Sequence, residues 1–463
     1  GGGTQSFFFR LQYDYNEKYL LAATMRADGS SNFAEDNRWG YFPSVSAGWV
    51  ITKEDFMEST SGVLNFAKIR ASWGQNGNQS IDAFQYLSNI NYSFPGYFFG
   101  DTKPVSGTTA ILANVPNPDI KWETSEQTDL GIDLTLFNDF SLTFDWYNKI
   151  TRDWLVQPTI PEIAGANAPY INGGDIQNKG IELALGYSKI IAKDWNISVN
   201  ANMAYNQNEV LSIANQTGII YGETNLLFQG IDEINRVEVG KPIGYFYGLK
   251  TNGIFQNDAE VAAGVQPNAM PGDVRFVDLN GDGQITQDDK TEIGNPNPDF
   301  TYGINASVSY KAFDFSIFTY GVAGTQNVFG VRDNSRPYNN YTTSIIDRWT
   351  SEGTSNTIPR VTYGSDANGN YTKFSDLYVQ NADFFRIKNI TLGVDFVQLT
   401  KSLDFFSKFR LYVGVNNLYT FTGYQGMDPE IGFGNSNQSW AKGIDVGFYP
   451  QPTTYMVGFN INF

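Results

Sequence analysis

The chain repeats a two-residue alternation of large apolar and small or polar side chains in thirteen separate segments. In the last segment, residues 455–463, Tyr, Val, Phe, Ile and Phe alternate with Met, Gly and two Asn. A period of two indicates a β-strand with one apolar face. The thirteen predicted strands are residues 6–15, 19–27, 43–51, 65–75, 122–137, 140–152, 178–189, 195–207, 300–310, 313–322, 384–397, 409–420 and 453–463.

The second face of these predicted strands is polar. Asn305 and Ser307, for example, alternate with Ile304, Ala306 and Val308. In a dry core such polar groups would lack hydrogen-bond partners, whereas a water-filled lumen satisfies them. The pattern therefore predicts an all-β fold, a transmembrane antiparallel β-barrel whose apolar face contacts lipid. The alternative is a large soluble β-protein, such as a propeller or tandem sandwiches, which would space its strands more evenly.

The predicted connections alternate between short and long. The short ones are 16–18, 138–139, 190–194, 311–312 and 398–408, with a helical turn expected near 53–62 on the same side. The long ones are 28–42, 76–121, 153–177, 208–299, 323–383 and 421–452. Bacterial outer-membrane barrels have tight turns at the periplasmic rim and long extracellular loops at the other. The loop pattern therefore favours an outer-membrane barrel.

Strand direction predicts that the sheet belongs to a larger barrel. Segment 453–463 follows a long loop, so it runs toward the periplasm, and by alternation segment 6–15 runs the same way. A complete single-chain barrel starts and ends in the periplasm and has an even number of strands. We therefore expect an odd number of strands before Gly1. We also expect a signal peptide that this sequence does not contain.

Composition narrows the function. The 463 residues contain no apolar run of about 18, so no transmembrane helix is predicted. Aromatic residues make up 15%, which suits the aromatic girdles of a membrane barrel. A net charge of −17 argues against nucleic acid as a partner. Cysteine and histidine are absent, so disulfides, thiol sites and histidine-based catalysis are excluded.

Residues 278–289 fit the twelve-residue calcium-binding loop. Asp278, Asn280 and Asp282 stand at its side-chain ligand positions, and Gln284 would offer its backbone carbonyl. Asp289 replaces the bidentate Glu of the last position, which predicts weaker binding of Ca²⁺. The alternative is an acidic, glycine-rich turn that needs no ion. The expected role of the ion is to rigidify the long extracellular loop 208–299, because no helix pair flanks the motif.

Aromatic residues cluster in three predicted loops. They are Tyr92, Phe94, Tyr97, Phe98 and Phe99, then Tyr245, Phe246 and Tyr247, then Tyr338 and Tyr341. Aromatic faces beside amides and carboxylates suit sugar or peptide recognition, and the alternative is that they pack the loops together. No pair of carboxylates stands out, and Gly-x-Ser-x-Gly, phosphate-loop and dinucleotide motifs are absent. No enzyme activity is therefore predicted.

Local strings across nearly the whole chain resemble the SusC/RagA-type TonB-dependent transporters of Bacteroidetes outer membranes. They include Met-Arg-Ala-Asp-Gly-Ser-Ser-Asn-Phe at 25–33 and Arg-Trp-Gly-Tyr-Phe-Pro-Ser-Val-Ser-Ala-Gly-Trp at 38–49. The other matching strings are 69–78, 117–123, 178–182, 278–289, 293–300, 385–393, 416–418 and 428–430. Together these strings are specific, although no single one is.

The resemblance implies a 22-stranded barrel with an N-terminal plug and a TonB box, of which residues 1–463 supply strands 10 to 22. It also implies a SusD-like surface lipoprotein as lid, a dimer of transporter–lid pairs, and contact with membrane lipid and lipopolysaccharide. Active import of oligosaccharides or oligopeptides is then the expected function. A non-transporting scaffold or surface-assembly barrel is the alternative. A passive porin is disfavoured, because the loops are long and aromatic.

Overall fold

The computed structural model describes residues 2–463, except 100–104, 159, 161–162, 164, 193, 333–337, 363–365, 401–402, 404 and 432–437. Thirteen strands form one antiparallel sheet in which each strand pairs with the nearest of the thirteen in sequence. In sheet order they are β1 (Thr4–Tyr15), β2 (Tyr19–Ser30), β3 (Trp39–Val50), β4 (Leu64–Asn78), β7 (Glu123–Leu136), β8 (Phe140–Arg152), β11 (Gly174–Ile191), β12 (Trp195–Ile213), β19 (Phe300–Tyr310), β20 (Phe313–Ala323), β23 (Phe384–Asp395), β24 (Lys408–Thr422) and β26 (Thr454–Asn462). All thirteen predicted wall strands are confirmed.

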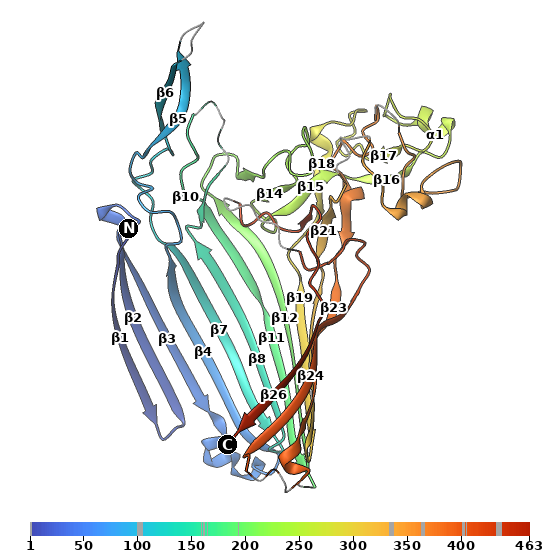
Figure 1. The fold of residues 1–463 in the computed structure, drawn as a ribbon. Helices are drawn as coiled ribbons and strands as arrows, with labels where there is room; N and C mark the ends of the chain where they lie inside the picture. Colours follow the sequence, from blue (N-terminus) through green and yellow to red (C-terminus); the bar gives the residue numbers. More distant parts are fainter. Residues whose placement is uncertain are drawn as a thin grey trace.

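The sheet curves into a tall, open wall (Figure 1). Short connections lie at the lower rim in this view and the long ones at the upper rim, as predicted. β1 and β26 are the two edges, and each pairs on one side only within the described residues. The predicted helical turn is also confirmed, as two 3₁₀ segments, η2 (Ile51–Lys53) and η3 (Asp55–Thr60).

Cross-strand register separates an apolar from a polar face. One row runs Ile132, Phe144, Leu183, Met203 and Tyr302 across β7, β8, β11, β12 and β19. The adjacent row on the opposite face runs Asp133, Thr143, Ala184, Asn202 and Gly303. Because side chains alternate along every strand, one face of the wall is continuously apolar and the concave face is polar.

Tight turns at the lower rim use backbone conformations that suit hairpins. Asn16 and Glu17 both have positive φ (56° and 52°), and so do Phe137 and Asn138 (54° and 62°). Two consecutive positive φ angles match the right-handed twist of paired strands, and Asn tolerates this region best after Gly. These turns therefore fix the register of the β1–β2 and β7–β8 hairpins.

The long connections contain secondary structure that the strand pattern did not predict. Five small sheets are found among the described residues of these connections, with the strand orders β9–β10, β5–β6, β13–β14–β15–β18, β16–β17 and β22–β21–β25. Their strands are β5 (Ile90–Phe99), β6 (Val105–Leu112), β9 (Leu155–Val156), β10 (Ile171–Asn172), β13 (Ile219–Tyr221), β14 (Asn235–Glu238), β15 (Tyr245–Leu249), β16 (Thr251–Ile254), β17 (Val274–Phe276), β18 (Lys290–Gly294), β21 (Gln326–Phe329), β22 (Val379–Asn381) and β25 (Ile444–Asp445). The described helical segments of the long connections are α1 (Asp258–Ala263), η1 (Glu35–Asn37), η5 (Gln287–Asp289), η6 (Thr343–Asp347) and η7 (Asp376–Tyr378). A further 3₁₀ segment, η8 (Phe396–Gln398), lies in the short connection between β23 and β24.

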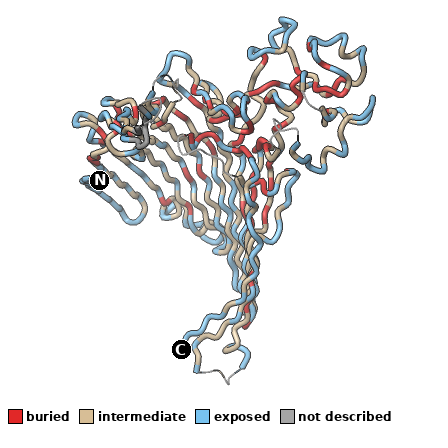
Figure 2. The backbone as a smooth tube through the Cα atoms, turned by 45° about the horizontal axis from the view of Figure 1, so that its top comes forward, coloured by how far each residue is buried: buried red, intermediate tan, exposed pale blue. Residues whose placement is uncertain are grey.

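Burial is concentrated in the upper part of the molecule, whereas the wall strands are mostly exposed or half-buried (Figure 2). The accessible surface is 26067 Å², against about 17,000 Å² expected for a compact soluble chain of 51.6 kDa. One buried cluster contains Phe246, Val328, Phe374 and Ile444, which come from three of the long loops. In the described part of the chain no helix is long and apolar enough to span a membrane.

Candidate functional site

A charged cluster lies on the concave face of the wall, on β4, β7 and β8. Arg70 donates to Asp145 (2.6 Å) and Asp133 (3.1 Å) and forms an ion pair with Asp129 (3.3 Å). Asp145 is 8% exposed, and one of its oxygens has no hydrogen-bond partner among the described residues. We call these four residues the Arg70 cluster. Three carboxylates face one guanidinium, so the cluster carries excess negative charge.

Gly131 makes room for the Arg70 cluster. It lies opposite Arg70 on one side and Asp145 on the other, in a single row across three strands. A Cβ at this position would lie 2.3 Å from an Asp145 oxygen and 2.6 Å from the Arg70 guanidinium carbon. Gly393 likewise leaves room for a second ion pair, in which two guanidinium nitrogens of Arg410 donate to the two carboxylate oxygens of Asp314 (2.7 and 2.5 Å).

We expect Gly131→Ala to destabilise the wall by about 1–3 kcal/mol, because the added methyl group must displace a charged side chain. The free energy of unfolding of the intact protein in detergent, from urea titration, would measure the loss. Gly62→Ala is the control, since nothing lies within 4 Å of its added Cβ. Equal stability of the two variants would contradict the close packing described here.

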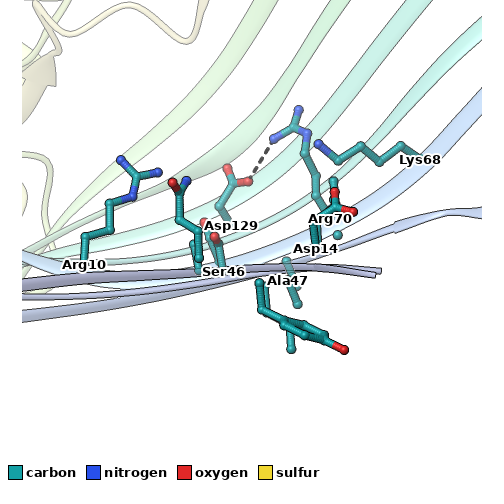
Figure 3. A pocket seen from close by; sticks show the side chains of 15 residues that line it. Arg10, Asp14, Ser46, Ala47, Lys68, Arg70 and Asp129 are labelled. Atoms are coloured by element: carbon teal, nitrogen blue, oxygen red, sulfur yellow. Dashed lines mark hydrogen bonds and ion pairs between the residues drawn. The ribbon is translucent and has the colours of Figure 1, made fainter. Parts of the chain in front are cut away.

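A hollow of about 510 Å³ adjoins the Arg70 cluster on the concave face. Figure 3 shows Arg10, Lys68, Arg70 and Asp129 rising from the same side of the sheet around it. The floor consists of small side chains, among them Ser46. The concave face is therefore wet and charged, and the cluster offers fixed charges to whatever fills the lumen.

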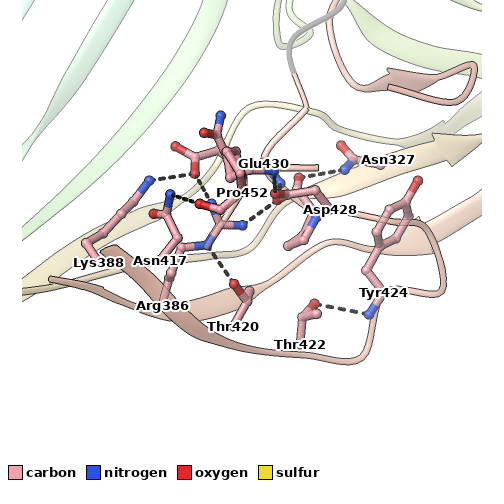
Figure 4. Close-up of polar contacts among 12 residues, drawn as sticks. Asn327, Arg386, Lys388, Asn417, Thr420, Thr422, Tyr424, Asp428, Glu430 and Pro452 are labelled. Atoms are coloured by element: carbon pink, nitrogen blue, oxygen red, sulfur yellow. Dashed lines mark hydrogen bonds and ion pairs between the residues drawn. The ribbon is translucent and has the colours of Figure 1, made fainter. Parts of the chain in front are cut away.

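A second polar cluster joins the wall to the loop between β24 and β26 (Figure 4). Arg386 on β23 is 1% exposed and binds Thr420 (2.6 Å), Glu430 (2.7 Å) and Asp428. Lys388, two residues along the strand, donates to Glu430 (2.7 Å). We call these five residues the Arg386 cluster.

The Arg386 cluster also contacts the far end of the same loop. Asp428 accepts a hydrogen bond from the backbone N–H of Gln451 (2.9 Å), and Asn417 donates to the Pro452 carbonyl (3.1 Å). Asn327, on β21, donates to the Pro429 carbonyl (3.0 Å). The Arg386 cluster, together with Asn417 and Asn327, therefore fixes both ends of the loop to the upper rim of the wall.

The first three predicted calcium ligands lie together in an exposed turn. Asp278 accepts hydrogen bonds from the backbone N–H groups of Gly281 (2.7 Å) and Gly283 (2.8 Å). Asn280 and Asp282 each accept from the N–H two residues further on (2.9 and 2.8 Å). A carboxylate or amide oxygen has two lone pairs, so each of these hydrogen bonds leaves one lone pair on its acceptor. Whether Ca²⁺ binds here stays a prediction.

The last predicted ligand fits less well. Asp289 is fully buried, and its two oxygens accept hydrogen bonds from the Leu279 (2.8 Å) and Thr286 (2.7 Å) N–H groups. Gln284 is exposed. Across the described ranges, no group of three or more Asp, Glu, His or Cys side chains is arranged to hold a metal ion. Calcium binding therefore stays a prediction. The Asp289 carboxylate already stabilises the turn through its hydrogen bonds from the Leu279 and Thr286 N–H groups.

Asp289 gives the turn a pH dependence. Burial tends to raise the pKa of its carboxyl, but the hydrogen bonds from Thr286, Leu279 and Asn280 outweigh it, so the pKa lies below the ordinary 3.8. A lowered pKa stabilises the folded turn above pH 3.8, and this contribution is lost as the pH falls further. We expect hydrogen-exchange protection of the Leu279 and Thr286 amides to be constant near neutrality and to fall below pH 3.8. Unchanged protection of these two amides in stronger acid would contradict the role given to the ionised Asp289 carboxylate.

The aromatic clusters divide between packing and exposure. Phe246 is fully buried, and the buried Tyr245 donates to Glu238, so this cluster is loop core. Burial, followed by that hydrogen bond, raises the pKa of Tyr245. In the hairpin β5–β6, Tyr92 and Phe98 are exposed. The side chains of Phe94, Tyr97 and Phe99 are outside the described part; Tyr338 is exposed, and Tyr341 lines a cavity.

Residues 1–418 match the family model described as TonB dependent receptor-like, beta-barrel. The chain belongs to this family. Two relatives are TonB-dependent receptor P3 of Formosa agariphila, 32% identical over 99% of this chain and 45% of the relative, and TonB-dependent receptor SusC of Bacteroides thetaiotaomicron, 31% identical over 99% and 43%. This receptor chain thus spans a little under half the length of the relatives it matches.

A solved structure titled as that of the RagAB peptide transporter has the same fold, with a TM-score of 0.79, 22% identity and coverage of 100% of this chain and 47% of that one. The predicted SusC/RagA resemblance and the outer-membrane location are therefore confirmed. The relatives are named as receptors or transporters, which agrees with the prediction that this receptor is not an enzyme.

We expect Val413→Arg to destabilise this receptor by about 2–3 kcal/mol, because Val413 lies in the lipid-facing row between Leu392 and Val457. The free energy of unfolding in lipid vesicles would measure it. Ser307→Arg is the control, since Ser307 is exposed on the concave face between Ser198 and Ser316, where water solvates the new charge. Similar losses for both variants would overturn the assignment of the faces.

Proposed function

We propose that this chain forms the C-terminal part of the wall of a TonB-dependent importer that takes up oligosaccharides or oligopeptides across the outer membrane. The observation that carries the proposal is the thirteen-stranded sheet, apolar on one face and charged on the other. The charged concave face suits a hydrated path for polar cargo. The folded loops at one rim suit capture of that cargo before it enters.

The proposal includes three partners. The strands and plug that complete the barrel would pair with the edges β1 and β26 and fill the concave face, because an open edge in lipid leaves backbone groups without hydrogen bonds. TonB would act on that plug. A SusD-like surface lipoprotein would cover the upper rim, and two transporter–lid pairs would form a dimer.

Uptake measurements test the proposal. The gene that encodes this chain would be deleted, and accumulation of labelled oligosaccharide and oligopeptide mixtures would be compared with that of the parent strain and of a strain without TonB. We expect both mutants to lose uptake of the same mixture, and to lose it to the same extent. Unchanged uptake in the deletion strain would favour the scaffold function, and uptake that is lost in the deletion strain but persists without TonB would favour a passive pore.

We also propose that the turn 278–289 binds Ca²⁺ through Asp278, Asn280, Asp282 and the Gln284 carbonyl, with Asp289 at the last position. The exposed oxygen donors support it. Because Asp289 is already bound by backbone N–H groups, we expect a dissociation constant on the order of 10⁻³ M. The ion would rigidify the loop 208–299.

Hydrogen exchange of the intact receptor, with and without calcium, tests this second proposal. Added Ca²⁺ should slow exchange at residues 278–289 in the parent protein but not in Asp282→Ala, which has no side-chain oxygen at that ligand position. Asp288→Ala is the matched control, because Asp288 is exposed and stands at no ligand position. If the ion has no effect on the parent protein, the turn is the ion-free alternative.

A further inference from the structure

A cavity of about 300 Å³ lies in the extracellular part, beside the pair that Leu249 of β15 forms with Lys290 of β18. The labels β15 and β18 mark this region above the wall in Figure 1. Ile231, Leu249 and Phe374 line the cavity and are buried. Ile231 and Phe374 belong to one buried loop cluster, so the apolar floor of the cavity is held in place by the loop core.

Lys373 also lines the cavity, and its position is set by packing. Its ammonium nitrogen lies 5.2 Å from the centre of the buried Phe276 ring. Gly369 leaves room for the stem of the lysine, because an added Cβ there would lie 2.9 Å from the Lys373 Cγ. Among the described residues, none forms an ion pair or a hydrogen bond with this ammonium. Its charge is therefore available to a ligand.

Burial makes the unpaired ammonium costly. It lowers the pKa of Lys373, and the opposing effect of the Asp366 carboxylate is smaller. Asp366 is itself occupied, since its two oxygens accept hydrogen bonds from the backbone N–H groups of Gly369 (3.1 Å) and Tyr371 (2.9 Å). An anionic ligand group beside Lys373 would offset the desolvation cost of the ammonium.

The other charges of the cavity balance each other. Among the described lining residues they are Asp232 and Lys290, which form an ion pair (2.7 Å). Asp232 also accepts a hydrogen bond from the side-chain N–H of Gln287 (2.8 Å), which leaves the amide oxygen of Gln287 as an acceptor for a ligand. The described lining therefore offers one net positive charge, on Lys373, and an acceptor for an N–H group.

The floor of the cavity favours a peptide over a sugar. A sugar packs its C–H face on an exposed aromatic ring, but Phe374, the one aromatic side chain in the described lining, is 2% exposed. Ile231, Leu249 and the half-buried Ile285 instead form an aliphatic surface, which suits an aliphatic side chain. A carboxylate and an aliphatic side chain share one residue only at the C-terminus of a peptide.

We propose that this cavity is a subsite for the C-terminal residue of an oligopeptide that ends in an aliphatic side chain. The terminal carboxylate pairs with the Lys373 ammonium, and the side chain packs on the apolar floor. The last peptide N–H donates to the Gln287 amide oxygen, and the rest of the peptide extends out of the cavity. The proposal deepens the proposed import function and rests on it for delivery of the cargo, while binding itself does not need TonB.

Calorimetry and hydrogen exchange on the intact purified transporter test the subsite. The probes are the tripeptide Ala-Ala-Leu, its C-terminal amide, acetyl-Glu-Leu amide and tri-galacturonate. We expect Ala-Ala-Leu to bind at least about tenfold more tightly than the other three, because they do not join a carboxylate and an aliphatic side chain in one residue. Bound Ala-Ala-Leu should slow exchange at residues 285–290 and 372–374 of the wild-type protein.

Lys373→Gln should remove the preference for Ala-Ala-Leu over its amide. Lys250→Gln is the matched control, because Lys250 follows Leu249 in the chain but is exposed and does not line the cavity. The comparison of acid and amide and the exchange measurement both use the wild-type protein, so a misfolded Lys373→Gln protein would not leave the result open.

Equal binding of the acid and its amide, unchanged exchange at the cavity, or a preference that persists in Lys373→Gln would each overturn the subsite. Tighter binding of tri-galacturonate or of acetyl-Glu-Leu amide would also overturn it, in favour of an acidic sugar or of a side-chain carboxylate. TonB-dependent uptake of some other cargo would then leave the import function standing. Binding of Ala-Ala-Leu without TonB-dependent uptake would overturn the import function alone.

Discussion

Arg386→Met is expected to release the loop between β24 and β26 from the wall, with a loss of about 3–5 kcal/mol in the free energy of local opening. The side chain is 1% exposed and binds Asp428, Glu430 and Thr420. Methionine has a similar length but no N–H groups, so it leaves the buried Asp428 carboxylate without a cation. Hydrogen exchange and limited proteolysis of residues 423–453 in the intact protein would measure the opening.

Lys388→Met is the matched control for this prediction. Lys388 lies on the same strand and binds the same Glu430, but its side chain is 24% exposed. Its removal should cost less than about 1 kcal/mol, because partly exposed ion pairs contribute little. Equal loop release in both variants would mean that charge near Glu430, and not the buried guanidinium, holds the loop.

Arg70→Met is expected to destabilise the wall by about 3–4 kcal/mol. The substitution leaves the carboxylates of Asp129, Asp133 and Asp145 facing each other without their shared cation. The loss is smaller than for Arg386 because the Arg70 side chain is 29% exposed and water can screen part of the repulsion. Urea titration of the intact protein in detergent would measure the free energy of unfolding.

Removing an acid together with the arginine checks the cause of that loss. Arg70→Met combined with Asp145→Asn should be more stable than Arg70→Met alone, because one buried like charge is gone. If the double variant is instead the less stable of the two, lost packing of the Arg70 stem, and not electrostatic repulsion, accounts for the effect.

The wall was predictable from sequence because contact of one face with lipid imposes a period of two over nine or more residues in each strand. The short strands of the loops were not, since segments such as β14 and β22 have four and three residues, too few to show the period. Their hydrogen bonds depend on segments far away, as in the parallel pairing of Val328 with Ile444. Such pairings leave no local signal.

The site was predictable in part. The acidic turn 278–289 could be located because its ligand spacing is local, but the burial of Asp289 depends on the fold around it. The Arg70 and Arg386 clusters were missed, although Arg386 and Asp428 both stand in strings that resemble the family. Their partners come from different strands and loops, and a sequence alone does not pair them. Arginine and aspartate at inward positions of neighbouring strands are the signal that would have found the first cluster.

The strictly sequential order of the wall strands has a consequence for how such receptors diversify. Consecutive strands β12 and β19 pair along their length although residues 214–299 separate them. Compared with a three-residue turn, closing a flexible loop of that length costs only on the order of 3 kcal/mol, because the entropy grows with the logarithm of length. Insertions at the upper rim can thus accumulate while the wall register stays unchanged. New ligand preferences can therefore arise in the loops while the strand pairing of the wall stays the same.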